Sequence, residues 1–166
     1  MRFLDVGCGT GRFLNFFKQS WPRLPALGLD LSDAYIEEAR HHLKDWGWLG
    51  LAVGKGEALP VASESVDAAA SVFLFHELPP KVRRAVLAEF ARVLKRGGRL
   101  VLVDSLQLGD EPDYDTMLER FPHNFHEPYY ASYLKEDFSA LARASGLTHV
   151  RDVNAFLAKV MVFDKV

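Results

Sequence analysis

Three glycines near the start of the sequence, Gly7, Gly9 and Gly11, lie where a short apolar run gives way to a helical pattern. Glycine tolerates the backbone dihedrals of a tight turn and lets a ligand approach bare backbone. A strand-to-helix turn lies at the carboxyl edge of a parallel sheet, where open α/β folds bind ligands. The glycines could serve only the turn, but the flanking strand and helix favour a ligand site. Arg12 follows Gly11, and this spacing disfavours a dinucleotide whose pyrophosphate rests on the helix amino terminus.

Two aspartates accompany this loop. Asp5 lies inside the apolar run, where an unpaired carboxylate is costly, so its partner must be a cationic ligand group or an Arg or Lys elsewhere in the chain. Asp30 ends the next apolar run, where a carboxylate can accept hydrogen bonds from both hydroxyls of a ribose. Ser32 and Asp33 can cap the following helix, so we predict ribose binding for Asp30. Several nucleoside cofactors use such an acid, and Asp30 alone does not choose among them.

Candidate acid–base groups follow later apolar runs. They are His76, Glu77, Asp104, His123, His126, Glu127, Tyr129, Tyr130 and Tyr133. Of these we predict His76, His126 and Tyr130 as the residues that handle a proton, if the chemistry needs one. In the alternative interpretation, the aromatic residues only pack their loop and the histidines are solvated. No metal site is predicted, because His123, His126 and Glu127 lack the HExxH spacing and Cys8 belongs to the glycine loop.

Alternating strand and helix patterns must position these groups, which indicates an α/β fold. Strands are predicted at 3–6, 27–30, 49–53, 66–73, 99–104, 148–154 and 157–163. Helices are predicted from 12 to before Pro22 (with Phe13, Phe16 and Phe17 on one face), from 32 or 33 to 46, from 79 to before Gly97 and from 135 to 144. The last two strands are too close for a helical crossover, so we expect an antiparallel pair. Residues 106–133 are predicted to be loop with one short helix around Met117.

Composition bounds the remaining possibilities. The 166 residues, 49% of them hydrophobic and 25% charged, predict a single domain over 1–166 with an ordinary globular core. A net charge of −2 argues against non-specific nucleic-acid binding. The longest apolar run, 68–75, is too short to span a membrane. The single cysteine cannot form an internal disulfide, so a cytoplasmic location is expected.

Six segments together carry a resemblance to a known family. They are Leu4-Asp5-Val6-Gly7-Cys8-Gly9-Thr10-Gly11, Gly28-Leu29-Asp30-Leu31-Ser32, Gly56-Glu57-Ala58-Leu59-Pro60, Ser65-Val66-Asp67, Phe75-His76-Glu77-Leu78-Pro79 and Arg92-Val93-Leu94-Lys95-Arg96-Gly97-Gly98-Arg99-Leu100. In this order and spacing, over residues 2–105, the chain resembles the class I S-adenosylmethionine (SAM) dependent methyltransferases. The branch it resembles includes the ubiquinone and menaquinone biosynthesis methyltransferases and small-molecule relatives.

The resemblance implies a Rossmann-like, doubly wound sheet of about seven strands, mostly parallel with an antiparallel last strand. It implies SAM as cofactor and S-adenosylhomocysteine (SAH) as product. The residues it assigns to the cofactor are Asp5, Gly7, Cys8, Gly9 and Gly11 at the methionine portion, Asp30 at the ribose, Leu31, Gly56 and Glu57 at the adenine, and Phe73 on the methionine side.

The sequence departs from the family pattern at two places. The family commonly has an aspartate two residues before the position of Glu57, which accepts from the adenine amino group, and here Lys55 has only donors. Backbone carbonyls must replace that contact, or cofactor affinity is weakened. Relatives usually carry helices before the first strand, and no N-terminal helices precede residue 3. We therefore expect either a fragment of a longer methyltransferase or a minimal version in which 106–133, or a second subunit of a homo-oligomer, caps the site.

Three functions remain to be compared. The first is a SAM-dependent methyltransferase acting on a small-molecule acceptor, and the aromatic residues of 121–130 indicate a planar or lipophilic one. The second is a SAM-binding module without catalysis, which Lys55 keeps open. The third is a nucleotide-dependent oxidoreductase, which Arg12 disfavours.

Overall fold

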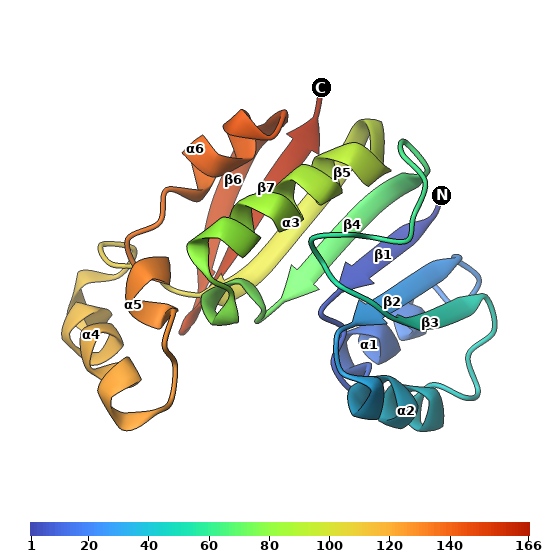
Figure 1. Cartoon of the computed structure of the whole chain (residues 1–166), viewed down its shortest axis with the longest axis horizontal. Helices are drawn as coiled ribbons and strands as arrows, with labels where there is room; N and C mark the ends of the chain where they lie inside the picture. The colour runs from blue at the N-terminus through green and yellow to red at the C-terminus, as the bar shows by residue number, and fades with distance from the viewer.

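The computed structural model describes all residues, 1–166, and forms one seven-stranded sheet with the strand order β3-β2-β1-β4-β5-β7-β6 (Figure 1). The strands are β1 (Phe3–Val6), β2 (Ala26–Asp30), β3 (Leu49–Val53), β4 (Val66–Val72), β5 (Leu94–Ser105), β6 (Leu147–Ala155) and β7 (Ala158–Lys165). β1 to β5 pair in parallel, whereas β7 is antiparallel to both β5 and β6. The predicted α/β sheet and its antiparallel closing pair are confirmed. Only two residues separate β6 from β7, which is enough for a hairpin but not for a crossover.

Helices cover both faces of this sheet (Figure 1). They are α1 (Arg12–Ser20), α2 (Asp33–His42), α3 (Pro80–Val93), α4 (Asp115–Asn124), α5 (Tyr130–Tyr133) and α6 (Phe138–Ala144), with 3-10 turns η1 (Phe75–Glu77) and η2 (Pro112–Tyr114). Successive residues of a strand point to opposite faces, and the core divides accordingly. Phe3 of β1 packs with α1 and α2, and its neighbour Leu4 packs with α3 and α6. No helix has the length and apolar character needed to cross a membrane.

Local chemistry sets the helix boundaries that matter for the site. α1 begins after Gly11, whose φ of 81° lies in the left-handed region. The hydroxyl of Ser32 accepts a hydrogen bond from the backbone N–H of Tyr35 and so caps α2, as predicted. Pro80 occupies the first turn of α3, where a missing N–H costs nothing.

Several predicted boundaries were wrong. α2 ends at His42 instead of Trp46, although the Trp46 indole still donates a hydrogen bond to Asn15 of α1. β5 begins at Leu94 rather than Arg99, because Leu94 already pairs with Val66 of β4; a bulge that includes Gly97, with a φ of 74°, separates this pair from the pair of Ala68 with Arg99. α6 begins at Phe138 rather than Lys135, since the carboxylate of Asp137 caps its amino terminus.

Two further corrections concern side chains near the site. Phe13, Phe16 and Phe17 do not share a buried face: Phe17 is buried, Phe13 is half-buried and Phe16 is exposed. The segment 106–133 is not mainly loop, because it contains η2, α4 and α5. Leu118 of α4 and Tyr130 of α5 are buried in the larger core cluster, and this packing stabilises short helices that the sequence pattern does not show.

Candidate active site

A cleft of about 800 Å³ opens at the carboxyl ends of the first four strands. Its walls come from the four segments that follow β1, β2, β3 and β4, namely residues 7–10, 30–31, 54–57 and 73–74. From β1 the chain adds β2 and β3 on one side of this strand, and then returns to add β4 on the other side. Open α/β sheets bind ligands at this switch in strand order. The cleft therefore lies at the predicted edge of the sheet.

The glycines of the loop have two different structural roles. Gly7, Gly9 and Gly11 have φ values of 74°, 53° and 81°, a region that favours glycine. A Cβ at Gly9 would meet no atom within 4 Å, so this position leaves bare backbone toward open space in the cleft. A Cβ at Gly11 would collide with Leu43, the residue that follows α2. Gly11, predicted to bind the cofactor, does not line the cleft and instead allows α1 and α2 to approach each other.

Asp5 is the most unusual group in the cleft. Its side chain is 1% exposed, and neither carboxylate oxygen has a hydrogen-bond partner. Burial, together with the negative charge of Asp30, raises the pKa of Asp5 to about 8. The possibility that an Arg or Lys of the chain partners this acid is wrong. The unpartnered oxygens fit a ligand that brings its own cationic group to the bottom of the cleft.

Asp30 is held in place by backbone donors. One carboxylate oxygen accepts from the N–H of Gly9 at 2.8 Å, and the other accepts from the N–H of Ser32 at 2.9 Å. A carboxylate oxygen can accept more than one hydrogen bond, so both oxygens can also receive hydroxyl groups from a ligand in the cleft. Asp30 therefore joins the glycine loop to the predicted ribose position. Leu31, next to it, lines the cleft and is 68% exposed.

Cys8 lines the cleft but has no nucleophilic character. The side chain is buried, and its sulfur lies close to Gly28 of β2, where a Cβ would approach within 3.0 Å. Burial, with the charges of Asp5 and Asp30, raises the pKa of the Cys8 thiol to about 12. The thiolate that a nucleophile needs is therefore absent at neutral pH.

Phe73 marks the opposite wall. Its φ of 54° places a non-glycine residue in the left-handed region, which costs on the order of 1–3 kcal/mol. The N–H of Phe73 donates to the carbonyl of Val103 at 2.7 Å, which fixes this conformation at the end of β4. The ring is 51% exposed and lines the cleft. The strained backbone of Phe73 therefore holds an exposed aromatic ring in the wall of the cleft.

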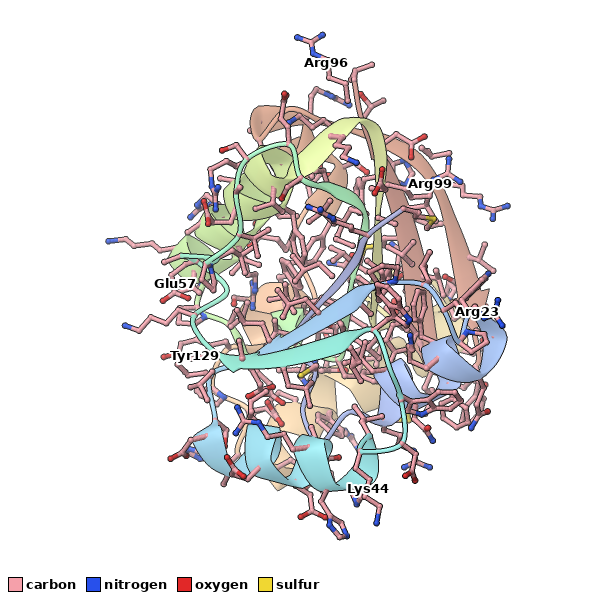
Figure 2. All side chains as sticks on the ribbon, turned by 90° about the vertical axis from the view of Figure 1, so that its right-hand side faces the viewer. Arg23, Lys44, Glu57, Arg96, Arg99 and Tyr129 are labelled. Atoms are coloured by element: carbon pink, nitrogen blue, oxygen red, sulfur yellow. The ribbon has the colours of Figure 1, made fainter.

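The segment after β3 forms the remaining wall. Gly56, Glu57 and Lys55 all line the cleft. A Cβ at Gly56 would come within 3.2 Å of Val6 and of Val86, so only glycine fits there without displacement. Glu57 is exposed and lies on the loop at the margin of the molecule (Figure 2). Lys55 is exposed too, which leaves its ammonium group free to move out of the cleft.

Of the three predicted proton-handling residues, the structure brings together only His76 and Tyr130, whose ring centroids lie 6.0 Å apart. His76 lies in η1 and does not itself line the cleft, whereas Phe73 and Glu77 on either side of it in the chain do. His126 is exposed and does not line the cleft. Tyr130 is buried, and its hydroxyl is hydrogen-bonded to that of Ser105 at 2.6 Å. No residue of 106–133 lines the cleft; α4 and α5 lie beyond the end of β5, beside η1 (Figure 1).

His76 is paired with a buried acid. Its Nδ1 lies 2.6 Å from Oδ1 of Asp104, the residue near the end of β5. Burial lowers the pKa of His76, but the hydrogen bond and charge of Asp104 outweigh this effect, so that the net pKa is raised. The sequence indicated both residues as candidates at one sheet edge but not their contact, because they are distant in the chain and meet only through the pairing of β4 with β5.

Some cleft residues had no signal in the sequence patterns. Phe13 and Phe16 of α1 and Tyr35 of α2 line the cleft. They form an apolar rim with Leu31 and Phe73, and Phe16, Leu31, Tyr35 and Phe73 are each more than half exposed. The helical spacing of Phe13, Phe16 and Phe17 predicts one shared face of the helix, and in the structure Phe17 of this face is buried whereas Phe16 is exposed. Aromatic residues in the first turns after a glycine loop are the signal that could have identified them.

Arg83 of α3 is a second residue that the sequence patterns did not indicate. It is fully buried, and its guanidinium donates to the carbonyl oxygens of Phe75 and Tyr129 at 2.9 and 2.8 Å. The same group pairs with Glu136 at 3.1 Å. Arg83 therefore ties the turn that carries His76 to the start of α5.

Comparison with known proteins decides the family. Residues 3–98, more than half of the chain, match the model of a methyltransferase domain. The chain belongs to this family. The matched residues contain the glycine loop, Asp5, Asp30, the segment after β3 and His76, and the cofactor of this class I family is SAM. The predicted membership of the methyltransferase family is thus confirmed.

Two curated relatives of the chain are named as methyltransferases with different acceptors. Over 99 residues, 60% of the chain, it is 39% identical to a malonyl-[acyl-carrier protein] O-methyltransferase of Methylococcus capsulatus, of which it covers 35%. Over 105 residues, 63% of the chain, it is 39% identical to a demethylmenaquinone methyltransferase of Thermotoga maritima, of which it covers 44%. The chain therefore spans less than half the length of these two relatives.

A solved structure supports the fold. The crystal structure of a SAM dependent methyltransferase from Aquifex aeolicus is 19% identical to the chain, with a TM-score of 0.76 over 100% of this chain and 82% of that one. At this identity the likeness establishes the architecture alone. The Rossmann-like sheet predicted for the methyltransferase domain is confirmed.

Proposed function

We propose that this chain binds SAM in the cleft at the carboxyl ends of β1 to β4 and transfers its methyl group to a small-molecule acceptor, leaving SAH. The observation that carries the proposal is the buried carboxylate of Asp5, whose two oxygens have no partner within the chain. SAM brings an ammonium group and a sulfonium, and either would compensate this charge. An acid left unpaired at such a cost is expected where a cation binds.

Each wall of the cleft has a separate task in this proposal. Asp5 pairs with the ammonium group of the cofactor, and the bare backbone at Gly9 allows the cofactor to approach closely. Asp30, oriented by two backbone N–H groups, accepts the ribose hydroxyls. Leu31 covers one side of the adenine with apolar surface, and the backbone of Gly56 and Glu57 meets its edge. Cys8 and Phe73 line the methionine end.

Little covalent chemistry is required of the protein. SAM supplies a methyl group on a sulfonium, which is already an activated leaving group. The residues of the cleft hold the acceptor in line with that methyl group, so that proximity and orientation supply most of the acceleration. His76 is the proposed proton acceptor, because Asp104 holds its ring and the next residue in the chain, Glu77, lines the cleft. His126 and Tyr130 have no comparable position.

The acceptor is proposed to be a small molecule. The names of the curated relatives, a malonyl-[acyl-carrier protein] methyltransferase and a demethylmenaquinone methyltransferase, support this class without selecting a member of it. The exposed rings on the rim, Phe16, Tyr35 and Phe73, favour a planar or lipophilic acceptor. We also propose a cytoplasmic location, since the one cysteine is a free, buried thiol.

A binding panel tests the cofactor. Thermal shift with SAM, SAH and NAD is expected to show stabilisation by SAM and SAH but not by NAD. Stabilisation by NAD alone would overturn the proposal. Asp5→Asn should lose most of the SAM effect, whereas Glu57→Gln, a matched carboxylate-to-amide change at the exposed margin, should keep it.

Transfer of labelled methyl from SAM to a metabolite pool separates an enzyme from a binding module without catalysis. The proposed enzyme labels one or a few compounds in the pool. Binding of SAM with no labelled product from any pool would favour the module. Limited proteolysis within 106–133 tests whether that segment is a lid: we expect cleavage to slow when SAM is bound, and unchanged cleavage would exclude this role.

A further inference from the structure

One face of the sheet is covered by helices over only part of its width. The core around α1 and α2 contains residues of β1 to β4 and none of β5, β6 or β7. On the opposite face, residues 100 and 102 of β5 and 161 and 163 of β7 belong to the core that includes α3 and α6. Successive residues of a strand point to opposite faces, so the valines next to these residues lie on the uncovered side. We call this surface the valine face; it consists of Val72, Val101, Val103, Val153, Val160 and Val162.

The valine face is continuous across four strands. From β4 to β6, its valines lie directly opposite one another on neighbouring strands. None of the six valines belongs to either core cluster, and Val153 is 47% exposed. Antiparallel strands with one face in water alternate apolar and polar residues, whereas residues 100–103 and 160–163 are apolar throughout. This pattern is typical of strands covered on both faces, so the valine face is expected to be an interaction surface.

A charged pair lies at the end of the valine face that is farther from the cleft. Arg99 of β5 and Asp164 of β7 lie opposite each other, and their side chains are paired at 2.8 Å. Each is two residues from a valine of its strand, so both lie on the valine face. The side chains remain 54% and 35% exposed, and Arg99 projects outward in Figure 2. A twofold axis along the strands, between β5 and β7, would place Arg99 of one copy on Asp164 of the other and valines on valines.

We propose that the valine face is the interface of a homodimer, in which two copies of this chain pack sheet against sheet through β4, β5, β7 and β6. Facing sheets pack about 10 Å apart, with their strands within about 30° of each other. The valines form the apolar centre of the interface, and the reciprocal contacts of Arg99 with Asp164 fix its alignment. A helix of an unrelated protein could also cover the valines, but it would give no role to an acid and a base that are exchanged by the twofold axis.

The dimer brings an aromatic residue of the second copy to the cleft. β4 and β6 are the outer strands of the valine face, so the twofold axis lays β6 of one copy over β4 of the other. β6 ends at Ala155, at the sheet edge where β5 ends at Ser105, and Phe156 follows it with 79% of its surface exposed. β4 of the first copy leads at this edge to Phe73, which lines the cleft. Phe156 of the second copy therefore extends the aromatic rim, and this role alone rests on the proposed function.

Sedimentation equilibrium of the full chain without cofactor tests the dimer. Wild type is expected to reach twice the mass of one chain, and Arg99→Asp and Asp164→Arg should each weaken the dimer at least about tenfold, because like charges then meet. An equimolar mixture of these two variants should restore the dimer, since each introduced charge faces an opposite one. The control is Arg143→Asp, the same change at an exposed residue of α6 on the other face, and it should have no effect. A monomeric wild type, a dimer that Arg99→Asp leaves intact, or a mixture that stays monomeric would overturn the proposal.

Paramagnetic broadening in mixed dimers tests the position of Phe156. Copies that carry a spin label through Phe156→Cys are mixed with ¹⁵N-labelled copies without it, and Cys8 is buried and so is not labelled. We expect the amide signal of Phe73 in the ¹⁵N-labelled copies to broaden, and to stay sharp when both copies carry Arg99→Asp. A dimeric mixture in which Phe73 stays sharp would refute the position of Phe156. SAM and SAH binding is measured separately by calorimetry: failure to bind either would refute the proposed function, whereas the mass and the broadening are read without cofactor.

Discussion

Binding of SAM should release protons from Asp5. In the free protein the pKa of Asp5 is about 8, so that at pH 6.5 about 97% of this carboxyl group carries a proton. An ammonium group placed beside it would favour the carboxylate, and the proton would leave as the cofactor binds. The ammonium group of free SAM is itself nearly fully charged at this pH, since α-amino groups titrate at about 7.7–8.0. The net release is therefore about 0.9 proton per SAM at pH 6.5.

Calorimetry in buffers of different ionisation enthalpy measures this release. The slope of the observed binding enthalpy against buffer enthalpy gives the number of protons, and the affinity should fall about tenfold from pH 7 to pH 6. Asp5→Asn should bind SAM weakly with no proton exchange. Glu57→Gln, which changes an exposed carboxylate at the same cleft, should release as many protons as wild type. Wild type that binds SAM without releasing protons, or an Asp5→Asn variant that still releases them, would refute the assignment.

The same raised pKa has a consequence for stability without cofactor. The pKa rises on folding from 3.8 to about 8, so the folded state holds a proton that the unfolded state has lost. Stability of the wild type therefore falls as pH rises from 4 to 8, by about 1.4 kcal/mol per unit for this group. Asp5→Asn has no such penalty. Its advantage in urea unfolding should be near zero at pH 4 and on the order of 4 kcal/mol at pH 7. A constant difference across this range would contradict the burial argument.

Three further predictions concern other residues. Gly11→Ala should destabilise the fold by about 1–3 kcal/mol in urea unfolding, because its methyl group collides with Leu43. Gly9→Ala should cost less stability but weaken SAM binding in calorimetry. Equal effects of the two variants on stability and on SAM binding would contradict the separation of roles within the loop. Lys55→Asp should tighten SAM binding, because the carboxylate can accept from the adenine amino group, and unchanged or weaker binding by calorimetry would be evidence against it. Arg83→Met should speed proteolysis within 106–133 severalfold, since it removes the donors to Tyr129; an unchanged cleavage rate would show that other contacts hold this segment.

Much of the fold could be predicted from the sequence because several local signals agree. The apolar runs at β1, β2 and β4, the glycine loop and the cap at Ser32 all point to alternating strands and helices. The closing hairpin followed from the short connection between β6 and β7. The ribose position at Asp30 followed from its place after β2 and is supported by two backbone hydrogen bonds that orient it.

The segment 106–133 could not be predicted, for physical reasons. Pro122 lies inside α4, and proline ordinarily ends a helix because it removes a backbone donor. α5 has only four residues, too few to form a helix by themselves. Both exist because tertiary contacts hold them, including the hydrogen bonds from Arg83 and the burial of Leu118 and Tyr130. Such contacts have no signature within the segment's own sequence.

Two residues of the cleft, Asp5 and Phe73, depart from the usual preferences for burial and backbone conformation. Asp5 places an unpartnered acid in a buried strand, and Phe73 places an aromatic residue in the left-handed region at the end of the neighbouring strand. Trp48, Glu64 and Phe156 also have positive φ values, but each lies in a connection between strands or elements and lines no part of the cleft. In a connection, a positive φ allows the chain to turn. The desolvation of Asp5 and the backbone strain at Phe73 destabilise the folded state, and no local contact compensates for them. Asp5 and Phe73 line the same cleft. In the proposed function, a cationic cofactor bound there pairs with the carboxylate of Asp5 and contacts the exposed ring of Phe73.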